Sequence, residues 1–287
     1  MTVPVSVIII SYNTKTYTRN ALTALFASNV NPAQVIVVDN ASTDGSDDMV
    51  EKEFSNVQLI RSKENIGFAK ANNIVIKKYV NQPYVWLLNS DTETGEKTLQ
   101  ELYEYLEAHP HVAAVGPQLV YPDGTLQSVG GGFPRFWNVF LYLFPVLWLV
   151  PLRFRRSLNT IAWLPQPLLR EGKKIDYATG ASLMLRKSAL DNVGLLGEQY
   201  FMYFEETDLC FRLWRSGKEV HVVDTEPVMH VYGGSFKRKH APDRLKYFLD
   251  SLVIFVQTYY RGFSKWSILC LVRLGGSFSI RVKSLRK

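Results

Sequence analysis

Apolar and polar positions follow two alternating patterns over the first 116 residues of the chain. Short runs of Val, Ile and Leu, such as VSVIII and VIVV, are followed by segments in which apolar residues recur at helical spacing. The runs predict strands at residues 5–12, 35–39, 57–61, 84–88 and 112–116, and the segments between them predict helices near 17–28, 47–54, 68–80 and 96–108. Strands separated in this way predict right-handed crossovers, and near-continuous apolar strands predict a sheet covered on both faces. The expected fold class is therefore α/β, with a mostly parallel central sheet flanked by helices.

The pattern changes after Gly116. A Pro-Asp-Gly turn predicts a hairpin over residues 118–129, and later segments predict a strand at 175–185 and a helix at 206–216. Apolar side chains return at helical spacing over residues 242–260, which predicts a helix that docks on the rest of the chain. The simplest division is one domain over residues 1–240, with halves at 1–116 and 117–240, followed by a basic amphipathic helical tail at 241–287.

The positive charge is concentrated near the C-terminal end. The formal net charge is +7, but residues 237–287 carry 12 Lys and Arg against 2 Asp and Glu, and the remainder has a net charge of −3. A basic tail on a slightly acidic body predicts contact with an anionic surface. Because the body lacks interleaved arginines and aromatic stripes, we expect an anionic membrane surface and no nucleic acid.

Two apolar segments bear on this expectation. The segment Phe136–Leu152 is interrupted by Asn138 and Pro145 and is shorter than the ~20 residues that span a bilayer, so it is either interfacial or part of a core. Residues 265–287 are expected to lie on the lipid surface together with residues 136–156. Their apolar positions include Trp266, Ile268, Leu269, Leu271 and Val272.

Two cysteines and the lack of a signal-peptide pattern favour a reducing compartment. The expected location is therefore the cytoplasm, peripherally on the inner face of the cell membrane.

Polar residues follow three of the expected strands directly. The first strand ends at Ser11-Tyr12-Asn13, the second at Asp39 and the fourth at Asn89-Ser90-Asp91. Ligands of open parallel sheets collect at these carboxyl ends, so Asp39 is placed to accept a hydrogen bond from a base or ribose hydroxyl, and Tyr12 to lie against a base. The alternative is that Asp39 is a turn residue and Ser46 a helix N-cap, and for Ser46 we favour the cap.

The chain lacks the glycine motifs that usually cradle phosphates. There is no G-x-G-x-x-G after the first strand and no G-x-x-x-x-G-K-[ST] anywhere, so a diphosphate would need another partner. Asn89 and Asp91 offer hard oxygen ligands of the kind that Mg²⁺ or Mn²⁺ takes when it bridges to phosphates. The same triplet is also a common turn sequence.

Three acids, Glu205, Glu206 and Asp208, stand at the start of the helix expected near 206–216. Acids in a first turn complement the helix dipole, which explains one or two of them. Placing all three carboxylates directly after the aromatic segment FMYF costs free energy unless they are solvated or take part in binding or catalysis.

Seven motifs occur in one order along the chain: VSVIIISYN, VIVVDNASTDGS, NIGFAKANN, WLLNSDTE, ATGASLMLRKSAL, FMYFEETDLCFRLWRSG and a late His-x-Tyr-Gly-Gly-Ser. As a set they resemble glycosyltransferase family 2, with its GT-A fold, and within it the rhamnosyltransferase-like members of bacterial polysaccharide assembly. The resemblance covers Val3 to about Ser235. It implies a nucleotide-binding half at residues 1–116 and an acceptor half at 117–240.

The resemblance also implies a site. Donor binding falls to Ser11, Tyr12, Asn13, Asp39, Asn65, Gly67, Asn72, Asn89, Ser90 and Asp91. Asp91 takes the place of the family's DXD carboxylate, whose first acid is Asn89 here, and His230 completes a site for Mg²⁺ or Mn²⁺. Glu206 is the expected general base, with Glu205 as the near competitor. The acceptor side is expected to include Asp176, Thr179, Gly180 and Asp208. Asp208 would bond to backbone or to Arg212. Residues 237–239 form either a basic flap over the diphosphate or a solvated charge run.

The implied activity is transfer of a sugar from a nucleoside-diphosphate donor, dTDP-rhamnose being the leading candidate, to a hydroxyl of a glycan or lipid-linked acceptor. One base and no second nucleophile predict inversion at the anomeric carbon. A sugar nucleotidyltransferase is an alternative, but it would show a Gly-rich basic loop that VSVIIISYNTKTYT lacks. A non-catalytic, membrane-associated GT-A scaffold is the other, and it would have lost acids such as Asp91 and Glu206.

Overall fold

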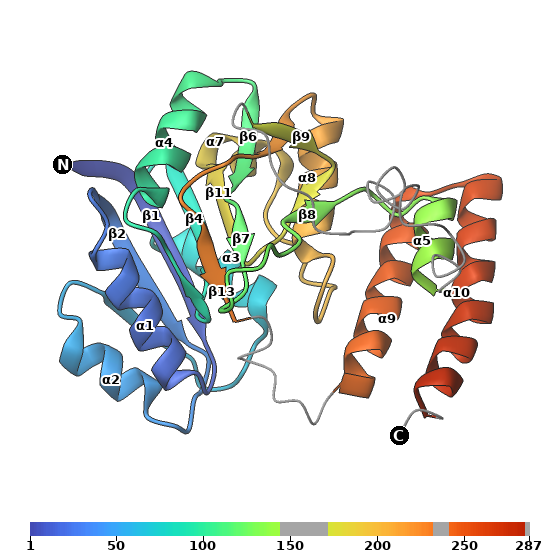
Figure 1. Ribbon diagram of the computed structural model, residues 1–287, viewed down its shortest axis with the longest axis horizontal. Helices are drawn as coiled ribbons and strands as arrows, with labels where there is room; N and C mark the ends of the chain where they lie inside the picture. The colour runs from blue at the N-terminus through green and yellow to red at the C-terminus, as the bar shows by residue number, and fades with distance from the viewer. Residues whose placement is uncertain (144–171, 232–240, 285–287) are drawn as a thin grey trace.

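The computed structural model describes residues 1–143, 172–231 and 241–284, and the side chains of 241–244 and 276–284 are left aside (Figure 1). Its centre is an eight-stranded sheet of order β3-β2-β1-β4-β11-β6-β12-β9. The strands are β1 (Thr2–Ser11), β2 (Asn31–Asp39), β3 (Gln58–Arg61), β4 (Tyr84–Asn89), β6 (Val112–Gly116), β9 (Lys173–Ile175), β11 (Ser182–Arg186) and β12 (Glu219–Val222). The first four strands in the chain pair in parallel, as do β6 and β12, whereas β11 and β9 run antiparallel to their neighbours. The mostly parallel sheet expected from the sequence is confirmed.

Helices cover both faces of this sheet because its strands are apolar on both faces. One face packs against α1 (Lys15–Phe26), α2 (Ser46–Glu53) and α4 (Thr98–Ala108). The other packs against α3 (Phe68–Lys78), α7 (Lys187–Val193) and α8 (Glu205–Arg215). Side chains alternate between the two cores along β1, where Val7 and Ile9 face the first core and Ile8 faces the second.

Two small sheets extend the second half of the chain. One has the order β5-β13-β7, from Thr92–Glu93, Val228–His230 and Leu119–Val120, and the other pairs β8 (Gly130–Gly131) with β10 (Tyr177–Ala178). The expected hairpin at 118–129 is present in a short form. Val120 bridges Leu126, and the backbone N–H groups of Tyr121 and Gln127 donate to the carbonyls of Thr125 and Leu119, while Leu119 and Val120 also pair with β13. The expected strand at 175–185 is broken twice, at Asp176 and at the turn 179–181, so that it contributes the last residue of β9, all of β10 and most of β11.

A third core joins the C-terminal helices to the sheet domain. In Figure 1, α5 (Phe136–Leu143), α9 (Ala241–Tyr259) and α10 (Gly262–Ser284) stand beside α8. Their apolar side chains pack with Tyr200 and Phe204, just before α8. Ser251 of α9 donates a 2.8 Å hydrogen bond to the carbonyl of Met202. The expected docking of the segment 242–260 is confirmed.

The apolar face of α10 differs from the one expected on lipid. Of the five apolar residues expected on lipid, Ile268, Leu271 and Val272 are buried in the third core and Leu269 is partly buried there. Trp266 is largely exposed. The correction has a simple cause: the apolar stripe that suits a membrane also suits packing against α5 and α9. No helix among the described residues is long and apolar enough to cross a bilayer.

The first turn of α2 corrects the assignment of Ser46. Gly45, at φ 77°, takes the N-cap position, and Ser46 is the buried first residue of the helix. The side chain of Asp44 accepts hydrogen bonds from both the backbone N–H and the hydroxyl of Ser46, at 3.0 and 2.5 Å. An Asp two residues earlier thus satisfies the helix start that Ser46 was expected to cap.

Candidate active site

Three strand ends meet at one edge of the large sheet. Ser11 lies opposite Asp39 in the β1–β2 pairing, and Ile10 lies opposite Asn89 in the β1–β4 pairing. The polar residues that end these strands are therefore neighbours, as their sequence positions predicted. The carboxyl edge of β2, β1 and β4 is the candidate active site.

The end of β2 presents a buried carboxylate oxygen. Asp39 Oδ1 accepts a 2.9 Å hydrogen bond from the backbone N–H of Ser42, while the buried Oδ2 finds no hydrogen-bond partner among the described residues. Asn13, at φ 53°, accepts a 2.8 Å bond from the N–H of Thr43 and so ties the end of β1 to the loop after β2. Tyr12 is 41% exposed beside it. A buried, unpartnered acceptor next to an open ring suits a ligand with a hydrogen-bond donor and a flat face.

Asparagines shape the neighbouring loop before α3. Asn40 donates a 2.8 Å bond to Asn65 Oδ1 and accepts a 3.1 Å bond from the N–H of Ile66. Asn65 also accepts from the N–H of Gly67, whose φ of 80° few other residues adopt. In α3, Asn72 donates to the carbonyl of Phe68, and its buried Oδ1 has no partner among the described residues. The sequence analysis gave Asn40 no role, although its position directly after Asp39 was the available signal.

The hydroxyls of Ser11 and Ser90 bond to the protein itself. Ser11 Oγ lies 3.1 Å from Thr14 Oγ1 and 2.9 Å from Thr18 Oγ1, and Thr14 donates a 3.1 Å bond to Ser90 Oγ. All four hydroxyls are buried. This chain of hydroxyls links β1 to the turn after β4 and thereby fixes the position of the adjoining Asp91.

Asp91 and His230 meet across the small sheet. His230 in β13 pairs with Thr92 in β5, which places the buried carboxylate of Asp91 with Oδ1 3.4 Å from Nε2 of His230. Nδ1 of His230 lies 2.6 Å from Oε1 of Gln127, whose amide nitrogen donates to the His230 carbonyl. Because an amide oxygen only accepts, Nδ1 carries the proton, and the lone pair of a neutral ring points from Nε2 toward Asp91.

These two side chains fit a divalent cation. A metal-binding histidine ordinarily donates its other ring N–H to an oxygen acceptor, which is the part that Gln127 takes here. Asp91 Oδ1 and His230 Nε2 are therefore the atoms that would hold Mg²⁺ or Mn²⁺. The sequence analysis missed Gln127, since nothing in the sequence pairs it with a residue 103 positions away.

The turn at residues 179–181 lies between the Asn89-Ser90-Asp91 triplet and the acids at the start of α8. The N–H of Asn89 donates a 2.9 Å bond to the carbonyl of Ala181. The preceding Gly180 borders Glu206, since a Cβ on Gly180 would lie 3.7 Å from that of Glu206. The turn at 179–181 thus contacts the Asn89-Ser90-Asp91 triplet on one side and Glu206 on the other.

The start of α8 is held in a strained conformation. Tyr203 and Phe204 both have left-handed φ values, 67° and 71°, which are uncommon for aromatic residues. Helix α8 begins at Glu205, and Glu206 lines a small pocket with a volume of about 70 Å³. Its other walls are Tyr177, Tyr203, Phe204, Thr207 and Phe248 of α9. With this strained backbone, the first turn of α8 places Glu206 and Thr207 in the wall of the aromatic pocket.

Burial changes the protonation of the paired acids. It raises the pKa of Glu206 to about 7, and burial together with the charge of Glu206 raises the pKa of Glu205 well above its ordinary value. These shifts favour the protonated form of Glu205, while Glu206 titrates near neutral pH. Of the two acids, Glu206 is the one that can accept a proton near pH 7.

The expected acceptor-side residues lie in different surroundings. Thr179 and Gly180 are in the turn beside Glu206, and Asp176 accepts a 2.8 Å bond from the N–H of Phe133. Asp208 is buried and bonds Arg212 as expected, with further bonds from the hydroxyls of Tyr200 and Tyr259 at 3.2 and 2.6 Å. Its carboxylate holds α9 against α8. The Gly-Gly-Ser at 233–235 and the basic segment 237–239 lie outside the described residues.

Comparison with known proteins identifies the family. Residues 6–194 match the family described as Glycosyl transferase family 2. The chain is 26% identical to an N-acetylglucosaminyl-diphospho-decaprenol L-rhamnosyltransferase of Mycobacterium tuberculosis, over 98% of this chain and 92% of the relative. It is 25% identical to the rhamnosyltransferase WbbL of Escherichia coli, over 79% of this chain and 83% of the relative.

Solved structures confirm the GT-A fold. A mannosyltransferase from Pyrobaculum calidifontis, in complex with GDP-Man and Mn²⁺, superimposes with a TM-score of 0.59 at 15% identity, over 96% of this chain and 69% of that one. Staphylococcus aureus TarS superimposes with a TM-score of 0.56 at 16% identity, over 93% of this chain and 70% of that one. The chain belongs to glycosyltransferase family 2.

Proposed function

We propose that this chain is a metal-dependent, inverting glycosyltransferase that moves a sugar, with rhamnose from dTDP-rhamnose as the specific candidate, onto a hydroxyl of a lipid-linked glycan. The observation that carries the proposal is the turn at 179–181, which borders Glu206 on one side and the Asp91 triplet on the other. The names of the two rhamnosyltransferase relatives support the sugar, and the lipid-linked substrate in the name of the first supports the acceptor class.

Each group has a defined part in the proposed reaction. Asp39 and Tyr12 would hold the nucleoside, and Asp91 with His230 would hold the cation. A bound divalent cation offsets the negative charge that develops on the leaving diphosphate. Glu206 removes the proton of the acceptor hydroxyl as its oxygen attacks the anomeric carbon, because a free hydroxyl is too weak an acid to lose that proton unaided. Attack opposite the leaving group inverts the anomeric centre.

A panel of nucleotide sugars tests the function. Release of nucleoside diphosphate is measured with dTDP-rhamnose and with UDP- and GDP-sugars, in Mg²⁺ or Mn²⁺, and the anomeric configuration of the product is read by NMR. We expect release with one donor class, abolished by EDTA, and a product of inverted configuration. Formation of a nucleotide sugar from a sugar phosphate would instead indicate a nucleotidyltransferase, and inactivity with every donor would indicate a scaffold.

The pKa of Glu206 predicts the pH dependence of the reaction. Because burial raises that pKa to about 7, the base is protonated and inactive below this pH, so kcat/KM should rise with pH and level off above it. Glu205→Gln should keep this limb, since the raised pKa of Glu205 favours the uncharged form that Gln resembles. An acid limb that stays near pH 4.5, the ordinary value for Glu, would contradict the assignment.

The same shift has a consequence for stability. The folded chain binds the Glu206 proton more tightly than the unfolded chain does, so this group's contribution to the free energy of unfolding falls as the pH rises from about 4.5 to about 7.

Exposed aromatic side chains on α10 support docking at a membrane surface, which we propose as the site of the reaction. Phe263 and Trp266 are 79% and 63% exposed, and their rings are 5.8 Å apart. Leu274 on the same helix and Trp137 on the neighbouring α5 are also exposed. Basic residues in the tail would add attraction to anionic lipid.

Cosedimentation with anionic vesicles at low salt tests this docking. Burying one large apolar side chain contributes ~1.5–3 kcal/mol, so the double variant Phe263→Ser, Trp266→Ser should weaken binding at least ~10-fold. Tyr79→Ser, which removes an exposed aromatic ring at the end of α3, is the matched control and should bind normally. Equal sedimentation of the double variant and the wild type would refute the docking surface.

A further inference from the structure

Three potential metal ligands lie at the amino ends of the strands, on the opposite side of the sheet from the candidate active site at the carboxyl ends. Both β4 and β6 are antiparallel to β11, and β12 is parallel to β6. Strands β4, β6 and β12 therefore run in the same direction. His111 directly precedes β6, and Glu219 begins β12. His221 follows two residues later and therefore lies on the same face of β12 as Glu219. The group is thus at the amino ends of β6 and β12, whereas Asp39 and Asn89 are at carboxyl ends.

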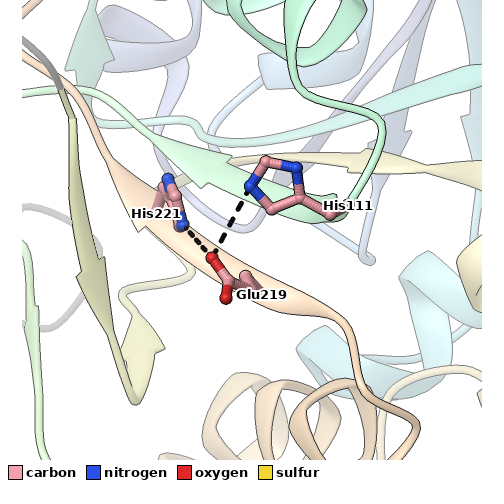
Figure 2. A group of neighbouring side chains, drawn as sticks. All are labelled: His111, Glu219 and His221. Atoms are coloured by element: carbon pink, nitrogen blue, oxygen red, sulfur yellow. Dashed lines mark hydrogen bonds and ion pairs between the residues drawn. The ribbon is translucent and has the colours of Figure 1, made fainter.

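The side chains converge on one carboxylate oxygen, as Figure 2 shows. Oε2 of Glu219 lies 2.7 Å from Nε2 of His221 and 3.7 Å from Nε2 of His111. All three ligand atoms lie within 4.8 Å of one another. A tetrahedral metal with bonds of ~2.0–2.1 Å keeps its ligand atoms ~3.3 Å apart. A cation therefore needs only small side-chain adjustments to reach all three.

Neighbouring residues hold two of the ligands in place. The hydroxyl of Tyr105, on α4, lies 2.8 Å from Nδ1 of His221, and Lys174 of β9 donates a 2.7 Å bond to Oε1 of Glu219. The bonds from Lys174 and His221 lower the pKa of Glu219 to about 2, so its carboxylate is ionised at any working pH. Lys174 bonds Oε1, so Oε2 is the oxygen that faces both histidines.

We propose that His111, Glu219 and His221 bind one Zn²⁺, with water as the fourth ligand. Two imidazoles and one carboxylate suit Zn²⁺ better than Mg²⁺ or Mn²⁺, which prefer oxygen ligands. In the arrangement drawn, the His221 Nε2–H can donate to Glu219. On binding, a neutral ring moves this proton from Nε2 to Nδ1, whereas a doubly protonated ring releases it and keeps the one on Nδ1. In both cases Nδ1–H donates to the Tyr105 hydroxyl, as ligating histidines ordinarily donate to a neighbouring oxygen.

The position of the site suggests a structural role. The ion would join the segment before β6 to β12 and, through Lys174, would fix the edge strand β9. Since the group lies at the edge opposite Asp91 and Glu206, loss of the ion should lower thermal stability and leave turnover unchanged.

Zn²⁺ titration by calorimetry tests the site, with the full chain at about pH 8, where a free imidazole is neutral. His111→Ala removes an exposed ligand, so the variant should fold, and it should bind Zn²⁺ at least ~10-fold more weakly. Tyr105→Phe, which removes only the supporting hydroxyl, should weaken binding ~10-fold or more. The wild type should also gain thermal stability with Zn²⁺, and His111→Ala should lose that gain.

Two controls separate this site from other imidazoles and from the active site. His109→Ala changes the histidine next to the group, whose ring stacks on Tyr105 at 4.1 Å and whose Nδ1 bonds the Tyr105 carbonyl. Asp91→Asn alters the active-site candidate. Both variants should retain the high-affinity Zn²⁺ site. Equal Zn²⁺ affinity of His111→Ala and wild type, or no Zn²⁺ binding by the wild type, would overturn the proposal.

Discussion

Glu206→Gln is expected to lower kcat by a factor of ~10²–10⁴ while leaving donor affinity nearly unchanged. Gln has the shape of Glu but cannot take a proton from the acceptor hydroxyl, so only the step that needs a base is lost. Helix α8 and the pocket beside Tyr177 should be preserved. The measurement compares single-turnover rates and donor dissociation constants for wild type and variant at pH 8, where the wild-type base is ionised.

Glu205→Gln is the matched control for this prediction. Glu205 belongs to the same helical turn, but its pKa is raised well above the ordinary value, which favours the uncharged form that Gln resembles. We expect Glu205→Gln to retain most of the wild-type rate. If Glu205→Gln lost the activity and Glu206→Gln kept it, the base would be Glu205.

The strain before α8 is consistent with this assignment. Two successive left-handed aromatic residues, Tyr203 and Phe204, are maintained because their rings are packed in the third core against α9. Conformations of this kind cost of order 1–3 kcal/mol each and persist where the surroundings impose them. The docking of α9 therefore supports the position of Glu206.

The first half of the fold was predictable because its signals are local. Apolar runs such as VIVV and the helical periods between them set the strands and helices, and parallel crossovers place their polar ends at one edge. Asp39 and Asn89 could thus be assigned to a common site from the residue pattern alone. The same reasoning placed Asp91 directly after a strand.

The remaining features depend on contacts between distant segments. The pairing of β13 with β5 brings His230 to Asp91, and the pairing of β12 with β6 brings Glu219 and His221 to His111. No local pattern encodes either pairing. The face of α10 was misjudged for a related reason, because helical periodicity cannot distinguish a protein core from a lipid surface.

Asp91→Asn is expected to reduce turnover by a factor of ~10²–10⁴, since a metal ion supplies several kcal/mol of stabilisation to the leaving diphosphate. The amide keeps the size of the side chain but removes the charge that would hold the cation beside His230. The loss should therefore appear as weaker Mn²⁺ dependence and as a donor affinity that no longer increases when Mn²⁺ is added. Both are measured by titrating Mn²⁺ in rate assays and in calorimetry with the nucleoside diphosphate.

The control for Asp91→Asn must show that the effect comes from the loss of this carboxylate and not from the change in the net charge of the protein. Asp224→Asn removes an exposed acid in the loop after β12, outside the candidate site, and should leave the Mn²⁺ dependence unchanged. His230→Ala, by contrast, should weaken Mn²⁺ binding in the same direction as Asp91→Asn, because its Nε2 lies only 3.4 Å from the Asp91 carboxylate. Since the two residues would share one ion, the double variant should be little worse than either single one. A wild-type Mn²⁺ response in Asp91→Asn would mean that the cation is held elsewhere.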